Sequence, residues 1–256
     1  MATFAIGDVH GMLAPLQALL ARIAAEAVAG DTVVFLGDYI DRGRDSKACV
    51  QAILDFEAAS PADVVCLLGN HEDWLLTTMS DPTSHSWLLG MDGLTAVESY
   101  SAEAAATIRA EARRLGGALY GGLVTLPYDA FFAAMPEAHR DFYRRLRRWH
   151  VTPDCFCAHA GIDPAAADPT SSSRAHVWGA HGFPEAYRGA RPVVYGHFND
   201  ADVGDDGWPR PRVVGATYGL DTISHGVLTA MRLPGPEFYQ SARFARRDAL
   251  PSGWDD

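Results

Sequence analysis

Five short motifs that combine glycine with Asp, His or Asn each follow a hydrophobic run, and this pattern constrains the fold more than any other feature of the chain. Runs of this length and composition are typical of buried strands. Because the ligands of α/β sheets collect where strands end, the polar side chains should converge at one rim, as a metal site requires. In chain order the motifs are Gly7-Asp8-Val9-His10-Gly11, Gly37-Asp38-Tyr39-Ile40-Asp41-Arg42-Gly43, Gly69-Asn70-His71-Glu72, Ala158-His159-Ala160-Gly161 and Gly196-His197.

The five motifs, in this order, resemble those of the calcineurin-like metallophosphoesterases. The Asp-Arg-Gly of the second motif narrows the resemblance to the phosphoprotein-phosphatase-like branch, which includes bacterial serine/threonine protein phosphatases and symmetrical diadenosine tetraphosphatases. A single short motif recurs by chance, whereas five in order, each after a predicted strand, are far more specific. The resemblance covers the strand ends from about residue 4 to 72 and from 155 to 230.

The resemblance implies an α/β fold in which two mixed β-sheets pack together, flanked by helices, with the site at one rim. The residues of the first half agree with this, because strand-like runs alternate there with amphipathic helical patterns at 13–28 and 45–57. This βαβαβ order predicts parallel strands joined by right-handed crossovers.

The middle of the chain has a different pattern. Residues 73–149 are mostly helical in character and are expected to form a cap over the site, with an exposed helix from Ser101 to Leu115. We therefore predict one domain over residues 1–235, with the cap inserted in it, and a C-terminal tail over residues 236–256.

Composition excludes several classes of protein. The 256 residues include 21 basic and 32 acidic side chains, and the net charge of −11 disfavours nucleic acid as a partner. No apolar stretch approaches the roughly 18 residues of a membrane span, and Asp8 and His10 fall where the apolar core of a signal peptide would lie. The 4 cysteines form no CxxC pair that would indicate a zinc site. We expect a complete cytoplasmic protein without a membrane partner, and the sequence leaves its oligomeric state open.

The resemblance also implies a set of metal ligands. The site would bind two divalent metal ions. Mn²⁺ suits a mixture of carboxylate, imidazole and amide-oxygen ligands, and Fe or Zn are alternatives. The single residue between Asp8 and His10 places both side chains on one side of an extended segment. By match to the family motifs, the first metal is held by Asp8 and His10, both metals by Asp38, and the second by Asn70, His159 and His197.

Three further residues match the catalytic positions of the family. His71 resembles the proton donor to the leaving group, Asp41 the carboxylate that orients this imidazole, and Arg42 the arginine that binds the phosphoryl oxygens. Asn70 is expected to contact the substrate as well as a metal. The alternative for Asp41 and Arg42 is a local salt bridge in a turn.

One position departs from the family pattern. Relatives often carry a second phosphate-binding arginine two residues after a tryptophan, but the residue two after Trp178 is Ala180. Arg174 and His181 are the candidates to bind the phosphate in its place, and the orientation of the substrate is expected to differ from that of the relatives.

The other histidines lack a motif. His85, His139, His150 and His176 are expected at the surface. The arginine-rich run from His139 to His150 has apolar residues at helical spacing and is interpreted as an amphipathic helix with a solvated basic face. The alternative is that this face steers an anionic substrate.

These observations predict a dinuclear-metal phosphoesterase that hydrolyses phosphate monoesters, with phosphoserine or phosphothreonine of a protein as the first candidate substrate. A symmetrical bis(5'-nucleosyl)-tetraphosphatase, acting on a small phosphorylated substrate, is the second candidate. A metal-binding phosphoprotein reader without turnover is the alternative from another class, and an intact proton donor argues against it.

Overall fold

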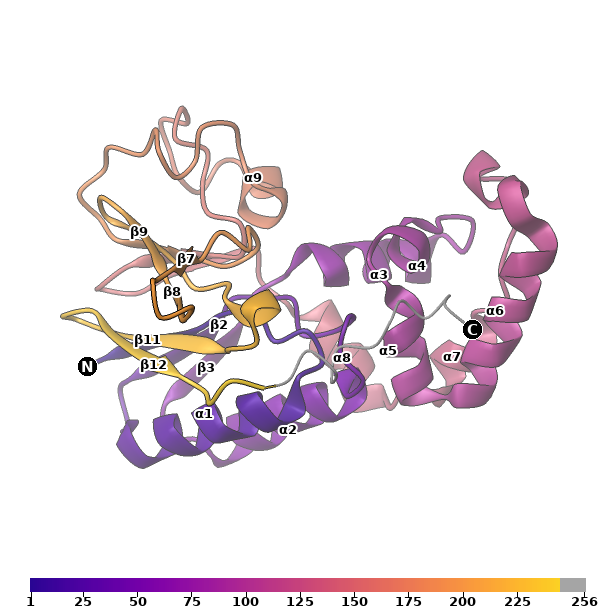
Figure 1. Ribbon diagram of the computed structural model, residues 1–256, viewed down its shortest axis with the longest axis horizontal. Helices are drawn as coiled ribbons and strands as arrows, with labels where there is room; N and C mark the ends of the chain where they lie inside the picture. Colours follow the sequence, from indigo (N-terminus) through magenta and orange to yellow (C-terminus); the bar gives the residue numbers. More distant parts are fainter. Residues whose placement is uncertain (245–256) are drawn as a thin grey trace.

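The computed structural model of the chain describes residues 1–244, which form two five-stranded β-sheets with helices around them (Figure 1). In the first sheet the three strands from the N-terminal part are parallel to one another, and the two strands from the C-terminal part are added antiparallel. In sheet order its strands are β12 (Glu237–Gln240), β11 (Thr229–Leu233), β1 (Thr3–Ile6), β2 (Thr32–Phe35) and β3 (Asp63–Cys66).

The second sheet is also mixed, which confirms the predicted fold class. Its three central strands are parallel, and each edge strand runs antiparallel to its neighbour. In sheet order the strands are β4 (Trp149–Val151), β5 (Phe156–Ala158), β6 (Val193–Tyr195), β10 (Thr217–Gly219) and β9 (Arg212–Val214), and a separate hairpin joins β7 (Asp202–Val203) to β8 (Pro209–Arg210).

The first sheet is buried on both faces, which explains why its strands are continuous apolar runs. Phe4 and Ile6 of β1 belong to a hydrophobic cluster that includes residues of the helices α1 (Leu13–Glu26) and α2 (Ser46–Ala59). Ala5, between them, belongs to a second cluster together with residues of β5 and β6. The two sheets therefore pack face to face, and α1 and α2 cover the outer face of the first (Figure 1).

The segment between β3 and β4 is helical, and Figure 1 shows it extending away from the sheets. One face of its longest helix is buried through Ala104, Ala105, Ile108 and Ala112, so that helix is exposed on one side only. A cap role for this segment stays a prediction. Its helices are α3 (Asn70–Ser80), α4 (Ser86–Gly90), α5 (Gly93–Tyr100), α6 (Ala102–Leu115), the 3-10 turn η1 (Gly116–Gly121), α7 (Asp129–Ala134) and α8 (Glu137–Arg144).

The expectation that the histidines without a motif lie at the surface is wrong for three of them. His85, His139 and His176 are buried, and each ring has a hydrogen-bond partner. The Nδ1 atom of His139, for example, lies 2.7 Å from the hydroxyl of Tyr100. His150 is half-buried.

The interpretation of residues 139–150 as one amphipathic helix is also wrong. The helix α8 ends at Arg144, and Trp149 begins β4, where it pairs with Ala158 of β5. Four arginines of this region have acidic partners; Arg144, for example, lies 3.0 Å from Asp141, and the others are Arg140, Arg145 and Arg148. Pairing of this kind leaves less positive charge to steer an anionic substrate.

The expected tail contributes to the first sheet. Residues 237–240 form β12, which pairs with β11, although they fall within the predicted tail 236–256. An edge strand has a single neighbour and carries a weak sequence signal, and the nearby Pro234 further suggested irregular structure. Residues 245–256 lie outside the described part of the chain. Within residues 1–244, no helix has both the length and the hydrophobicity that crossing a bilayer requires.

Candidate metal centre

The five motifs lie at one rim of the two sheets. The first three motifs follow the parallel strands β1, β2 and β3, and the other two follow β5 and β6. The third motif contains the first residues of α3. The loops are tightly turned, because several residues other than glycine have left-handed backbone conformations, among them His10 (φ 43°), Asp38 (φ 52°) and His197 (φ 70°). Such conformations cost free energy and cluster at functional sites.

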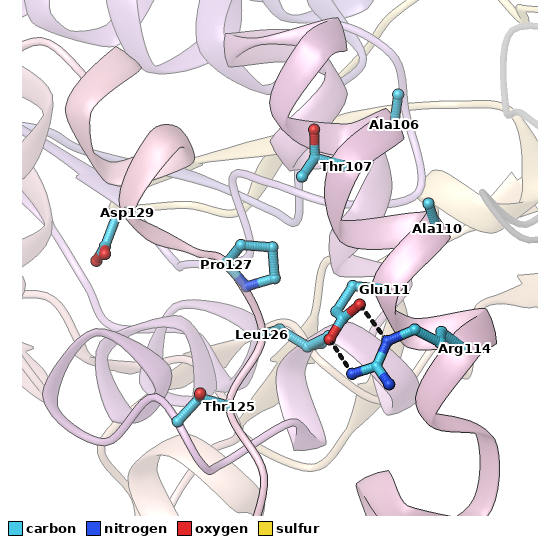
Figure 2. A pocket seen from close by; sticks show the side chains of 9 residues that line it. All are labelled: Ala106, Thr107, Ala110, Glu111, Arg114, Thr125, Leu126, Pro127 and Asp129. Carbon is cyan, nitrogen blue, oxygen red and sulfur yellow. Dashed lines mark hydrogen bonds and ion pairs between the residues drawn. The ribbon is translucent and has the colours of Figure 1, made fainter.

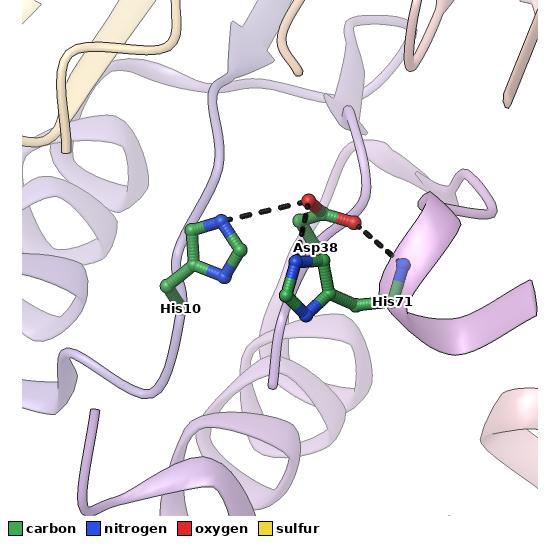
Figure 3. Close-up of side chains that lie close together, drawn as sticks. All are labelled: His10, Asp38 and His71. Atoms are coloured by element: carbon green, nitrogen blue, oxygen red, sulfur yellow. Dashed lines mark hydrogen bonds and ion pairs between the residues drawn. The ribbon is translucent and has the colours of Figure 1, made fainter. Parts of the chain in front are cut away.

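Asp38 is at the centre of the rim. Its Oδ2 atom lies 3.5 Å from Nε2 of His10 and 3.8 Å from Nε2 of His71, as Figure 3 shows, and its Oδ1 atom lies 3.4 Å from Nε2 of His159. Burial acts to raise the pKa of Asp38, but the surrounding histidines, His159 foremost, lower it well below its usual range. The carboxylate is thus ionised and faces nitrogen atoms on both of its oxygens.

Two groups of side chains with the geometry of a metal site share Asp38. One consists of His10, Asp38 and His71, and the other of Asp8, Asp38 and His159; within each group the ligand atoms lie within 4.8 Å of one another. A carboxylate common to two groups suits a bridge between two ions. The first group differs from the expected one, since His71 takes part in it.

The amide of Asn70 joins the last two motifs. Its Oδ1 atom lies 2.9 Å from Nε2 of His159 and 3.0 Å from Nδ1 of His197. Burial, followed by the neighbouring His159, lowers the pKa of His197 to about 4, so this ring is neutral near pH 7. Asn70, His159 and His197 are therefore brought together as the sequence predicted, and their role as ligands stays a prediction.

The tautomers of two histidines test whether the site fits a cation. The Nδ1 atom of His10 lies 3.0 Å from the carbonyl oxygen of Ile40, and that of His159 lies 3.0 Å from the carbonyl oxygen of Leu36. Each ring donates its Nδ1 proton there, and burial lowers the pKa of both rings, so Nε2 is left with a lone pair. Metal-bound histidines commonly donate their second nitrogen in this way.

Lone pairs that point at oxygen lone pairs need a positive charge between them. Nε2 of His159 faces the oxygens of Asn70 and Asp38, and Nε2 of His10 faces Asp38 and, at 4.0 Å, Oδ2 of Asp8. Neither the amide oxygen of Asn70 nor the ionised carboxylate of Asp38 supplies a proton, so the donor set fits divalent cations.

Asp8 connects the two sheets at this rim. It follows β1, and its carboxylate accepts the backbone N–H of His197, which follows β6, at 3.0 Å. Burial, then the nearby Asp221, raises the pKa of Asp8. Gly196 is required here, because a Cβ at this position would overlap Oδ1 of Asp8.

Asp221 is a site residue that was not predicted from the sequence. Its buried carboxylate accepts the backbone N–H of Asn199 at 2.8 Å, and burial raises the pKa of Asp221 to about 6. Asp221 thus adds negative charge beside Asp8 and fixes the loop after His197. A signal was available, since Asp221 closely follows a strand, β10, as the ligand candidates follow theirs.

His71 forms a dyad with Asp41. Its Nδ1 atom lies 2.7 Å from Oδ2 of Asp41, and the same oxygen accepts the indole N–H of Trp87 at 2.9 Å. Burial acts to lower the pKa of His71, but Asp38 and Asp41 raise it above its usual value, which favours the protonated ring. Arg42 is close by, with Nη2 at 3.5 Å from Nε2 of His71.

Glu72 holds the loop that carries Asp38. Its buried carboxylate accepts the backbone N–H groups of Asp38 at 3.0 Å, Tyr39 at 2.9 Å and Ile40 at 3.3 Å. The pKa of Glu72 is raised overall, chiefly by burial and next by the negative charge of Asp38. The hydrogen bond from the N–H of Tyr39 acts in the opposite direction. The motif Gly69-Asn70-His71-Glu72 was recognised in the sequence, but nothing in it revealed which backbone groups the carboxylate would meet.

The two candidates for a second phosphate-binding residue are not joined to this cluster. Arg174 and His181 are exposed, and within residues 1–244 neither forms a hydrogen bond or ion pair with the ligand candidates. The guanidinium carbon of Arg174 lies instead 5.8 Å from the ring centroid of Trp178. Their role in substrate binding stays a prediction.

The chain belongs to the calcineurin-like phosphoesterase family, whose pattern matches residues 1–199. This confirms the resemblance inferred from the five motifs and, at the level of the family, the expectation of a metal-dependent phosphoester hydrolase.

Individual relatives match over a shorter segment. Over 76 residues the chain is 38% identical to a symmetrical bis(5'-nucleosyl)-tetraphosphatase of Pseudomonas fluorescens strain SBW25 and 43% identical to one of Cellvibrio japonicus strain Ueda107. The match covers 30% of this chain and 25% or 26% of these relatives. The aligned segment thus spans about a quarter of their length.

Solved structures share the fold over nearly the whole chain. A candidate diadenosine tetraphosphatase superposes with a TM-score of 0.59 at 19% identity, covering 93% of this chain and 92% of that one. A serine/threonine protein phosphatase of Saccharomyces cerevisiae superposes with a TM-score of 0.56 at 12% identity, covering 96% and 81%. At such identities the likeness concerns the fold alone.

Proposed function

We propose that this chain is a phosphohydrolase that uses two divalent metal ions and acts on symmetrical dinucleoside tetraphosphates. Hydrolase activity is supported above all by one observation: the nitrogen and oxygen lone pairs of a candidate metal site surround Asp38, next to the His71–Asp41 dyad. The names of the relatives that match over 76 residues support the choice of substrate. This reverses the order of the two candidates that the sequence alone favoured.

The metal ions, when bound, would supply an activated water and neutralise charge on the phosphoryl oxygens. Asp8, His10 and Asp38 would hold one ion, and Asp38, Asn70, His159 and His197 the other. This mixture of ligands favours Mn²⁺, with Fe or Zn as alternatives.

The protein itself would handle the proton and the phosphoryl group. His71, protonated and oriented through Nδ1 by Asp41, would donate its Nε2 proton to the departing oxygen. Arg42, 3.5 Å from that nitrogen, would bind phosphoryl oxygens on the same side as the leaving group. A reader without turnover has no use for this dyad.

A serine/threonine phosphoprotein is the second candidate substrate, because the Asp41-Arg42-Gly43 sequence is the feature that led to the phosphoprotein-phosphatase-like branch. A panel of substrates with Mn²⁺ decides between the two: diadenosine tetraphosphate, a phosphoserine peptide, p-nitrophenyl phosphate and a phosphodiester. We expect diadenosine tetraphosphate to have the highest kcat/KM and to yield ADP as the only product on ion-exchange chromatography. A higher kcat/KM for the peptide, or AMP and ATP as products, would reject the proposal.

A further inference from the structure

Two tryptophan rings are in contact beside the metal centre. Trp74 of α3 and Trp178 of α9 (Ser173–Trp178) have ring centroids 4.8 Å apart and an interplanar angle of 49°. Both side chains are half-buried, so each keeps exposed ring surface. Trp178 is fixed by a hydrogen bond from its indole N–H to Asp73, at 2.9 Å.

Both rings are tied to the half of the centre that contains Asn70. The helix α3 begins at Asn70, so Trp74 lies one turn further along, a rise of about 6 Å. The helix α9 is joined to the loop after His159, because Ala160 donates its backbone N–H to the carbonyl oxygen of His176 at 2.7 Å. A group bound to the metals at Asn70 and His159 is therefore within a short reach of the two rings.

The surroundings of the pair suit a nucleotide. Trp74 also lines an open depression of about 620 Å³, together with Leu89 of α4 and the exposed Tyr120. This volume is within the range of small-molecule sites. Arg174 lies over Trp178, and no carboxylate within residues 1–244 is at ion-pair distance from it. An aromatic surface, a cavity bordered by Trp74 and a cation over Trp178 without an acidic partner thus lie on or beside the two helices that carry the pair.

We propose that Trp74 and Trp178 form the binding site for a purine base of the substrate, and that Arg174 contacts a phosphate of the same nucleotide. The inference rests on the proposed function and extends it to the part of the substrate away from the reacting phosphate. Stacking of a base on an aromatic side chain is strong enough to change affinity by about tenfold or more and tolerates different bases. A phosphoserine peptide has no group that requires this platform.

The test compares tryptophan variants on two substrates with Mn²⁺. Trp74→Leu and Trp178→Leu are expected to raise KM for diadenosine tetraphosphate about tenfold, and to leave kcat/KM for p-nitrophenyl phosphate within about twofold. Trp74→Phe, which keeps a ring, should recover most of the loss.

Trp208 offers a matched control. It is also half-buried, donates its indole N–H to Gln240 at 2.7 Å, and has the Arg243 guanidinium carbon 5.0 Å from its ring centroid, but it lies in the β7–β8 hairpin. Trp208→Leu should leave both KM for diadenosine tetraphosphate and kcat/KM for p-nitrophenyl phosphate unchanged. Equal losses on both substrates in the Trp74 and Trp178 variants would show that the pair only joins α3 to α9, and would overturn the inference.

Binding without turnover separates this inference from the proposed function. ADP titrated into the full chain in the presence of EDTA should quench tryptophan fluorescence, and Trp74→Leu should weaken its binding about tenfold, whereas ribose 5-phosphate should give no quenching. If ADP binds in this way but diadenosine tetraphosphate is not cleaved, the proposed function fails and the base site stands. If diadenosine tetraphosphate is cleaved while Trp74→Leu leaves both ADP binding and KM unchanged, the base site is refuted.

Discussion

Replacement of Glu72 by glutamine should loosen the loop that carries Asp38. Both carboxylate oxygens of Glu72 face backbone N–H donors, two on Oε1 and one on Oε2. A glutamine keeps two of the bonds if its carbonyl oxygen takes the place of Oε1. Its NH₂ group then meets the N–H of Asp38, where two donors oppose each other in a fully buried site.

The cost follows from this geometry. A buried N–H group that is left without an acceptor costs about 1–3 kcal/mol, and here it also faces a second donor. We therefore expect Glu72→Gln to lower the free energy of unfolding by about 3 kcal/mol. With a urea m-value of about 3 kcal/mol/M, the midpoint of unfolding falls by roughly 1 M.

Urea denaturation followed by circular dichroism measures this shift, and Glu137→Gln is its control. The Glu137 side chain is 64% exposed and pairs with Arg140 at 2.9 Å and Arg144 at 3.2 Å. Exposed helix pairs typically contribute about 0.3–0.5 kcal/mol each, so loss of both pairs should move the control midpoint by about 0.3 M or less. If the two variants have the same midpoint, Glu72 is not the acceptor of three backbone N–H groups, and the reasoning is refuted.

Three further changes test the site and the helical segment. Asp38→Asn should weaken Mn²⁺ binding in calorimetry more than about 100-fold, because both ligand groups share this carboxylate; an unchanged affinity would exclude it as a bridge. His71→Asn should lower turnover of a phosphoserine peptide about 10²–10⁴-fold and that of p-nitrophenyl phosphate much less, since a serine alkoxide needs a proton to leave and nitrophenolate does not; equal losses would contradict a proton donor. Burial is the main cause that lowers the pKa of His139, and the positive charge of Lys47 adds to it. Below about pH 6.5 the unfolded chain therefore takes up a proton at this residue while the folded chain does not. The free energy of unfolding consequently decreases as the pH falls. His139→Gln should therefore flatten the decrease in unfolding free energy between about pH 6.5 and 5, and parallel curves for both proteins would argue against this.

The centre of the fold was predictable because its local signals agree. Parallel strands that are buried on both faces are continuous apolar runs, such as the one that ends at Phe35, and the motif after each run marks the end of the strand. Since such loops meet at one edge, the proximity of Asp38 and His159 followed from the sequence even though 121 residues separate their positions in the numbering.

The features that were missed depend on contacts between distant residues. His139 is buried because Tyr100 and Gln51, on two other helices, supply its partners, and no local pattern encodes that. Trp149 falls at the helical spacing of the apolar residues before it, but its pairing with β5 places it in a strand. The role of Glu72 follows from three backbone groups more than 30 residues earlier in the chain.

The position of β1 has a consequence for synthesis of the protein. This strand, which leaves the ribosome before the other strands of its sheet, lies between β2 and β11, and Ile6 pairs with Ala230. At about 5–20 residues per second, the partner on that side appears on the order of 10–45 s after β1 itself. Until then, the strand that leads directly to Asp8 and His10 has one open edge. The candidate metal centre is accordingly completed only after β11 has been made, and a nascent chain that stops before β11 has all of the N-terminal motifs without the sheet that aligns them.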